Sequence, residues 1–176
     1  GHRVHCISAS TVLRAETPPG ETPVYGYPHL ARSIRRSGDA RTVTLQLLDL
    51  FRRMVFNILI DNTDDHERNH SLRLALSGYP ELTPAYDVLP TLLNLGYQAM
   101  GVGRAGAESS LDNALSDINE FGLKRARAIE LIQQVAHAVS QWQAHFTACG
   151  VSAADMDLLA ASIDRPALKL QRREYG

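Results

Sequence analysis

The chain has 176 residues, a length that fits one globular domain. Its 44% hydrophobic and 21% charged residues are ordinary globular values, and a formal net charge of −1 gives no overall reason to expect nucleic-acid binding. Cys6 and Cys149 are far apart, which argues against a disulfide scaffold or a zinc ribbon. Because no apolar run reaches the ~18 residues that cross a bilayer and no signal-peptide pattern is present, we expect a cytoplasmic protein with reduced thiols and no membrane contact.

The first predicted elements lead to one strongly apolar helix. Residues 17–23 are rich in Pro, Gly and Thr and predict a surface loop. Residues 27–36 predict a short helix that ends at Ser37-Gly38-Asp39. From residue 42 to about residue 60, apolar side chains occupy nearly every face of the expected helix, which is typical of a helix buried inside a domain. The polar residues that follow would therefore stand on a rigid support.

A short hairpin is predicted next. Residues 71–76 alternate polar and apolar and indicate a strand, with Ser77-Gly78 as its turn. Residues 81–85 are expected to pair with this strand, so that Asp87 lies at the exit of the hairpin. Residues 96–106 hold four glycines and predict an irregular, mobile segment.

The remainder is predicted to be helical. Ser110 would cap a helix over residues 111–121 that ends at Gly122. A longer helix would follow to Gly150, with Trp142 and Phe146 on an apolar stripe that we assign to the core. A last helix is expected from Ser152 to residue 163, and the basic tail 165–175 would be a solvated terminus, with phosphate contact as the minor alternative. The fold class is therefore mainly α with a small β-hairpin.

Residues 63–70, Thr-Asp-Asp-His-Glu-Arg-Asn-His, carry the clearest functional signal. Asp64 and Asn69 have the D-x-x-x-x-N spacing of a protein-kinase catalytic loop, and Asp87 stands where a kinase keeps a second, metal-binding Asp. Phosphoryl transfer needs a carboxylate that accepts the proton of the attacking hydroxyl, and hard oxygen ligands for Mg²⁺. Asp64 fits the first role, and Asn69 and Asp87 fit the second.

Other interpretations of this motif stay open at this point. It would also suit a polar turn with capping residues, since a bare D-x-x-x-x-N is common. His66 and His70 lie four residues apart and would bind a transition metal on a helix, as in a metal-dependent phosphohydrolase. Alternatively, His66 would orient the loop by bonding a backbone carbonyl, and His70 is as consistent with a surface residue as with a functional one. Neither a glycine-rich phosphate loop nor its lysine is found in the sequence.

Residues 56–71 and 82–90 resemble the C-terminal part of HipA-type toxin kinases of bacterial type II toxin–antitoxin pairs. The shared pattern is F-N-x-x-I-x-N-T-D-x-H-x-K/R-N-x-S, followed by L-x-P-x-Y-D. The resemblance covers most of the chain, so we expect residues 1–176 to form one domain, the C-terminal lobe of a protein-kinase-like fold.

The resemblance implies a serine/threonine kinase with ATP as phosphate donor and Mg²⁺ as metal. Asp64 would be the catalytic Asp, His66 its loop-shaping neighbour, and Asn69 and Asp87 the Mg²⁺ ligands. It also implies a HipB-like helix-turn-helix antitoxin as partner, contact with DNA only through that antitoxin, and a protein substrate such as an aminoacyl-tRNA synthetase. The family's N-terminal, ATP-binding lobe has no counterpart here, so the alternative is a non-catalytic module that docks an antitoxin or a DNA-bound complex.

Overall fold

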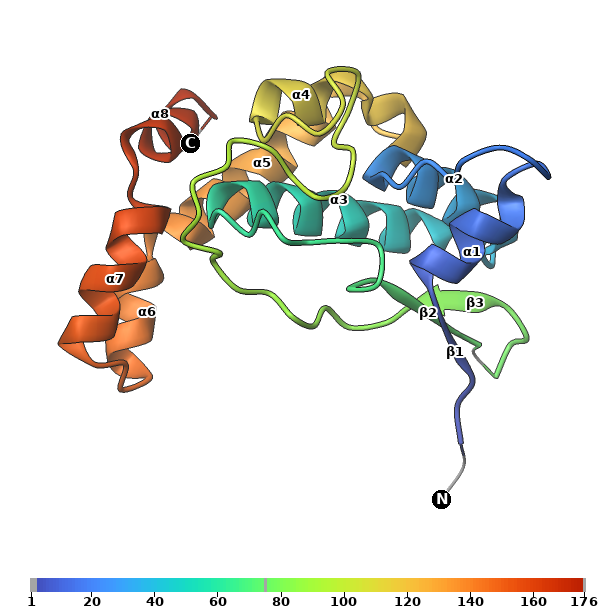
Figure 1. Cartoon of the computed structure of the whole chain (residues 1–176), viewed down its shortest axis with the longest axis horizontal. Coiled ribbons are helices and arrows are strands. Elements are labelled where there is room, and N and C mark those ends of the chain that lie inside the picture. The colour runs from blue at the N-terminus through green and yellow to red at the C-terminus, as the bar shows by residue number, and fades with distance from the viewer. Residues whose placement is uncertain (1–2, 75, 176) are drawn as a thin grey trace.

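The computed structural model describes residues 3–74 and 76–175. Helices form most of the molecule, and a small antiparallel sheet lies along one side (Figure 1). The predicted fold class is therefore confirmed. Among the described residues, no helix is long and apolar enough to cross a membrane.

The elements follow one another in a simple order. The helices are α1 (Ala9–Glu16), α2 (Tyr27–Ser37), α3 (Val43–Leu59), α4 (Leu111–Ser116), the 3₁₀ helix η1 (Ile118–Phe121), α5 (Arg125–Ser140), α6 (Trp142–Ala148), α7 (Ala153–Ile163) and α8 (Pro166–Tyr175). The strands are β1 (Cys6–Ser8), β2 (Ser71–Leu74) and β3 (Pro80–Leu82).

The core is built around α3, as the apolar run predicts. Leu50, Phe51, Met54 and Ile58 of this helix are fully buried. Helices α2 and α5 flank it in Figure 1, and η1 contributes Phe121, whose ring packs edge-on against Phe51. Burial of this one helix on several sides gives its C-terminal end a fixed position.

The sheet has one strand more than the predicted hairpin. β2 pairs with β3 as expected, with Leu72 opposite Leu82, and the turn between them includes Ser77-Gly78. β1 adds an antiparallel strand on the other edge of β2, with Ile7 opposite Leu72. Strand β2 ends at Leu74, so Leu76 is outside it, and Ala75 lies outside the described residues.

Two predicted helices are each divided in two. The helix capped by Ser110 stops at Ser116 and continues as η1, and the long helix stops at Ser140 before α6 begins. At both breaks the last helical residue is a serine whose hydroxyl donates back to a carbonyl: Ser116 to Asn113 (2.6 Å) and Ser140 to Ala136 (2.8 Å). Such local bonds compete with the helical ladder and favour a bend. The core assignment of Trp142 is confirmed, since it is buried, and Phe146 packs edge-on against it.

The basic tail is not a solvated terminus, because residues 166–175 form α8. Arg172 is buried and its Nη1 donates to the carbonyl of Ile163 at the end of α7 (2.7 Å). The same atom lies 3.4 Å from the carbonyl of Leu59 at the end of α3. One guanidinium therefore satisfies carbonyls at two helix ends, which explains why a charged side chain enters the interior.

Candidate functional site

The motif forms an irregular loop that starts where α3 ends. Helix α3 finishes at Leu59, and the chain reverses at Asp61, whose φ of 63° lies in the left-handed region. Aspartate tolerates this conformation better than most residues. Residues 60–70 form no helix or strand, so the predicted position of the polar motif on a loop behind a rigid helix is confirmed, although most of its residues are buried.

Asp64, Asn69 and Asp87 line one open hollow of about 400 Å³. The side chains of Asp64 and Asp87 are exposed, whereas Asn69 is buried. The other residues that line it are Asn62, Leu89, Pro90, Thr91 and Leu93. The structure therefore brings together three residues that span 23 positions in the chain, and their separation along the sequence is bridged by the hairpin.

The segment that carries Asp87 is fastened to the loop on both sides of this residue. Before it, the hydroxyl of Tyr86 donates to the carbonyl of Arg68 (2.7 Å). After it, the amide of Thr91 donates to the carbonyl of Asp61 (3.0 Å). Asp87 itself has a φ of 56°, again in the left-handed region. Its position is thus set by two bonds to the loop that holds Asp64 and Asn69.

A buried polar network lies directly beneath the loop. Asp65 is 1% exposed, and its Oδ2 accepts from the hydroxyl of Tyr27 on α2 and lies 2.8 Å from Nε2 of His70. Asn57 of α3 donates to the Tyr27 hydroxyl (3.0 Å), and Asn62 donates to Asn57 (3.1 Å). These bonds favour one arrangement of the groups that they join, although the buried Nδ1 of His70 has no partner within the described residues. Loop, α2 and α3 are therefore joined by five polar side chains.

The network affects the ionisation of Tyr27. Burial is the main cause that raises the pKa of its phenol well above the ordinary value, and the negative charge of Asp65 adds to it. Tyr27 is thus held as a neutral hydrogen-bond donor toward Asp65.

The two histidines of the motif differ from what the sequence suggests. His70 is not a surface residue, since it is 2% exposed and packs edge-on against Tyr27. His66 is half-buried, and its own carbonyl accepts from the amide of Asn69 (2.9 Å). The predicted bond from the His66 ring to a backbone carbonyl is not found: within residues 3–74 and 76–175, its buried Nδ1 has no hydrogen-bond partner.

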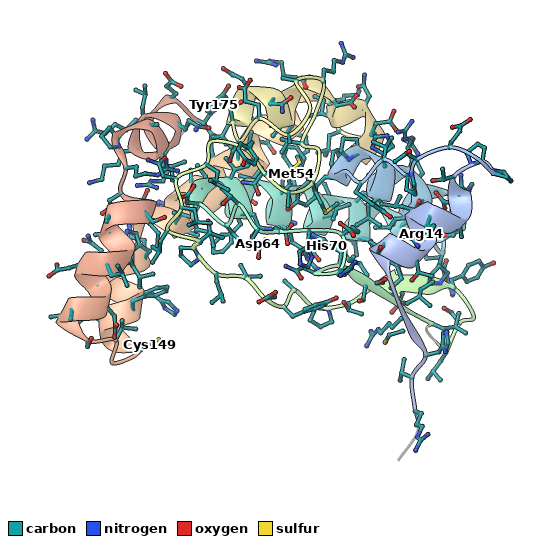
Figure 2. All side chains as sticks on the ribbon, viewed as in Figure 1. Arg14, Met54, Asp64, His70, Cys149 and Tyr175 are labelled. Atoms are coloured by element: carbon teal, nitrogen blue, oxygen red, sulfur yellow. The ribbon has the colours of Figure 1, made fainter. Side chains whose placement is uncertain are left out.

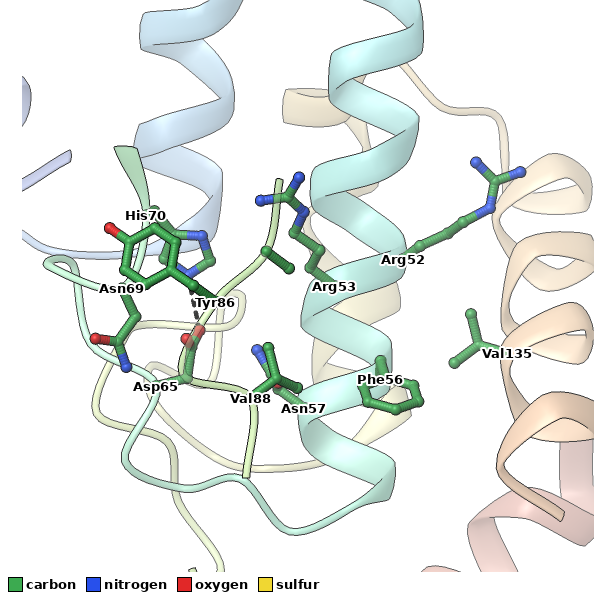
Figure 3. Close-up of a pocket in the computed structure, with 11 residues that line it drawn as sticks. Arg52, Arg53, Phe56, Asn57, Asp65, Asn69, His70, Tyr86, Val88 and Val135 are labelled. Atoms are coloured by element: carbon green, nitrogen blue, oxygen red, sulfur yellow. Dashed lines mark hydrogen bonds and ion pairs between the residues drawn. The ribbon is translucent and has the colours of Figure 1, made fainter. Parts of the chain in front are cut away.

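A second hollow of about 260 Å³ lies next to the first and shares Asn69 with it. Figure 3 shows Arg53 and Phe56 reaching this hollow from α3, opposite Asp65, His70 and Tyr86. Nη2 of Arg53 donates to the carbonyl of Thr83 (2.6 Å), four residues before Asp87. Arg53 thereby attaches the exit of the hairpin to α3.

The side-chain oxygens of Asp64, Asn69 and Asp87 around the larger hollow are of the kind that binds magnesium. Two carboxylates and one amide oxygen are hard ligands, and Mg²⁺ takes one or two carboxylates and keeps several waters, which an open hollow allows. A transition-metal site at His66 and His70 is not supported, because their segment is not helical and Nε2 of His70 faces Asp65. In the described part of the chain, no group of three or more His, Cys, Asp or Glu residues is placed to hold a metal ion.

Figure 2 shows Cys149 at the tip of the α6–α7 pair, away from Asp64 and His70, and both cysteines are free and exposed.

Sequence reasoning missed Tyr27, Asn57 and the pairing of Asp65 with His70. One signal was present: Asn57 is a polar residue inside the apolar run of α3, and a buried amide needs partners. Tyr27 lies 38 residues before Asp65, a separation at which no local pattern identifies a partner.

The comparisons with known proteins identify the family and the fold of the chain. The HipA-like C-terminal domain family matches residues 1–142. A chain in the structure of the Shewanella oneidensis MR-1 toxin–antitoxin complex of HipA, HipB and operator DNA has a similar fold, with a TM-score of 0.72 and 17% sequence identity. The match covers 98% of this chain and 44% of that chain, so the present chain spans less than half its length. No curated protein shows significant sequence similarity. Because the family matches most of its residues, the chain belongs to the HipA-like C-terminal domain family.

Proposed function

We propose that this chain is the catalytic lobe of a serine/threonine protein kinase that transfers the γ-phosphate of ATP to a protein hydroxyl. The observation that carries the proposal is the meeting of Asp64, Asn69 and Asp87 in one open hollow. A kinase uses two Asp residues and one Asn to orient the acceptor and to hold magnesium. The segments that carry them are attached to α3 through Arg53 and Asn57, and to each other through the carbonyl of Asp61, which favours the fixed geometry that such a reaction needs.

Each residue has a separate role in this proposal. The carboxylate of Asp64, exposed to the hollow, accepts the proton of the attacking hydroxyl, whose oxygen forms the new bond to phosphorus while the bond to the bridging oxygen of ADP breaks. Asn69 and Asp87 would hold Mg²⁺, which neutralises charge on the phosphates when bound. His66 would shape the loop through its carbonyl bond to the Asn69 amide.

The proposed partners follow from the family. The structural match is to a complex that contains HipB and operator DNA, which supports a HipB-like helix-turn-helix antitoxin as partner and DNA contact through that antitoxin. An aminoacyl-tRNA synthetase is the substrate class to test first. Because the chain spans 44% of the matched chain, we propose that residues 1–176 act as one lobe of a larger kinase.

A second candidate function is that of a non-catalytic module that docks an antitoxin. The sequence favours it in one respect, since neither a glycine-rich phosphate loop nor its lysine is found in these residues. The two functions differ in whether the hollow binds Mg²⁺–ATP.

Calorimetry of Mg²⁺–ATP binding to this chain is the first test. Asp87→Asn removes the charge yet tolerates the left-handed backbone at this position, and Asp157→Asn on the exposed face of α7 is a matched control. Kinase function predicts binding that is lost in Asp87→Asn and kept in Asp157→Asn. An absence of binding, together with capture of a HipB-like protein, would favour the docking module.

The catalytic role of Asp64 needs a second assay in the larger kinase that we propose. Loss of a general base typically lowers the rate by about 10²- to 10⁴-fold. Asp64→Ala should therefore abolish most phosphate transfer while the protein stays folded. Full transfer by Asp64→Ala would overturn the proposed mechanism.

A further inference from the structure

The C-terminal helices contact the start of the candidate catalytic loop. Oγ of Ser162, near the end of α7, donates to Oδ2 of Asp61 (2.9 Å). Nη2 of Arg165, between α7 and α8, donates to Oδ1 of the same carboxylate. The side chain of Asp61 is 2% exposed and that of Arg165 is 16% exposed, so this ion pair is largely shielded from water. The two donors lie 101 and 104 residues after Asp61, outside the residues that match the family.

The backbone of Asp61 holds both segments that form the candidate site. Its carbonyl accepts from the amides of Thr63 and Thr91 (both 3.0 Å) and from the hydroxyl of Thr91 (2.9 Å). The hydroxyls of Thr63 and Thr91 are also 2.6 Å apart. Thr63 immediately precedes Asp64, and Thr91 lies on the segment that carries Asp87. One carbonyl group therefore joins the segment that carries Asp64 to the segment that carries Asp87, in addition to the bond from Tyr86 to Arg68.

The backbone of Asp61 adopts a conformation that is unfavourable for most residues. The φ of 63° at Asp61 costs about 1–2 kcal/mol for a residue other than glycine, less for aspartate. A carboxylate bonded to a hydroxyl and a guanidinium inside the protein offsets this cost and keeps the backbone in place. Without those donors, the buried carboxylate of Asp61 would be more stable in water. Its movement toward water would turn the backbone carbonyl of Asp61 away from Thr63 and Thr91.

We propose that Arg165 and Ser162 are positioning residues of the candidate catalytic site and act through Asp61. The α7–α8 pair is then a functional part of this chain, which fixes the loop that carries Asp64 in register with the segment that carries Asp87. This inference rests on the proposed kinase function for its effect on rate, and on the structure alone for its effect on the loop.

Hydrogen exchange on this chain tests the effect on the loop without any assay of activity. Arg165→Met keeps much of the side-chain volume and removes the charge. We expect faster exchange at the amides of Thr63 and Thr91, whose acceptor is the Asp61 carbonyl, and unchanged exchange at Leu131 and Ile132 in the core of α5. Arg173→Met on α8, with no bond to Asp61 among the described contacts, is the control. Unchanged Thr63 and Thr91 amides, or equal acceleration throughout the chain, would overturn the proposal.

Ser162→Ala is a milder second variant if Arg165→Met does not fold. It removes one donor to Asp61 and leaves the ion pair, so the same two amides should show a smaller acceleration. No acceleration in this variant would contradict the proposed route through Asp61.

A double-mutant cycle in the longer kinase tests the effect on rate. Displacement of a reacting group by about 1 Å costs on the order of 10²-fold, so we expect Arg165→Met to lower kcat by about 10- to 100-fold with a smaller change in KM for ATP. Asp61→Gly, which accepts the left-handed backbone, should lower kcat similarly, and adding Arg165→Met to it should have no further effect. Arg165→Lys should restore part of the rate. Independent, multiplicative effects of the two substitutions would overturn the proposal. If the wild-type kinase itself transferred no phosphate, the proposed function would fail, and the exchange experiment would still decide this inference.

Discussion

Nε2 of His70 lies 2.8 Å from Oδ2 of Asp65, and both side chains are buried beneath the loop. Each of them directly follows a proposed site residue, because Asp65 comes after Asp64 and His70 comes after Asn69. The hydrogen bond between Asp65 and His70 therefore joins two parts of the loop on its buried side. It holds in place the two positions next to Asp64 and Asn69.

Removal of the Asp65 side chain should destabilise the fold strongly. Asp65→Ala leaves the Tyr27 hydroxyl and Nε2 of His70 without their shared acceptor inside the protein. Each buried group that is left without its hydrogen-bond partner costs about 1–3 kcal/mol. Urea unfolding followed by circular dichroism should show this loss in the free energy of unfolding. Asp64→Ala is the matched control, since Asp64 is exposed, and it should change stability by less than about 0.5 kcal/mol. Similar losses in both variants would contradict the buried role of Asp65.

Tyr27 should make stability depend on pH in the alkaline range. Its pKa is raised in the folded state, chiefly by burial, whereas a phenol in the unfolded chain ionises near pH 10. Its contribution is fully present below about pH 10 and is lost as the pH rises toward the folded-state pKa, because unfolding then releases a proton. Tyr27→Phe removes that proton release, so its stability should fall less steeply above about pH 10.

Urea unfolding of both proteins between about pH 8 and about pH 11 measures this difference. Below about pH 10, Tyr27→Phe should be less stable than wild type by about 1–3 kcal/mol, since Asn57 loses its acceptor and Asp65 loses a donor. Tyr97→Phe, which removes an exposed phenol, should keep the wild-type pH dependence. Parallel curves for wild type and Tyr27→Phe would show that the phenol is not held neutral by its surroundings.

Gly103 should not tolerate a side chain. A Cβ at this position would overlap the carbonyl oxygen of Asn113 and lie 2.5 Å from Oγ of Ser116, both on α4. Such overpacking against a backbone atom costs about 1–3 kcal/mol. Gly101→Ala is the matched control two residues away, where the nearest atom would lie at an ordinary 3.5 Å. Thermal unfolding should show a clear loss for Gly103→Ala and a change of less than about 1 kcal/mol for Gly101→Ala. Equal stability of the two variants would mean that the segment around Gly103 can move away from α4 without a cost in stability.

Features that depend on neighbouring residues were predictable from the sequence. The apolar run identified α3, and the alternation in residues 71–76 with its turn identified the hairpin. Asp64, Asn69 and Asp87, which the sequence selects by their spacing, line one hollow, and their roles stay a prediction. For the helix and the hairpin the signal is local, because helix burial and strand pairing leave a pattern over fewer than about 20 residues.

Features that depend on distant partners were not predictable in this way. The pairing of Tyr27 with Asp65 and of Asp61 with Arg165 joins residues 38 and 104 positions apart, and single polar residues carry no record of such partners. The helix breaks after Ser116 and Ser140 arise from single hydroxyl bonds that compete with an otherwise helical pattern. α8 was mistaken for a solvated tail because its buried side includes a charged residue.

Arg172 is that charged residue, and its loss should destabilise the C-terminal half. Its guanidinium donates to the carbonyl of Ile163, and Nη2 lies 3.0 Å from Oδ1 of Asp164. Burial lowers the pKa of Arg172, while the nearby Asp164 carboxylate acts in the opposite direction, so the buried charge depends on these partners. Arg172→Met keeps the apolar stem and removes all donors, which should cost about 3 kcal/mol in the free energy of unfolding. Arg173→Met, exposed on the same helix, should cost less than about 0.5 kcal/mol. Proteolysis should then cut Arg172→Met first in α8, because its contact with the end of α7 is lost. A stability equal to that of Arg173→Met would show that α8 is held by its apolar residues alone.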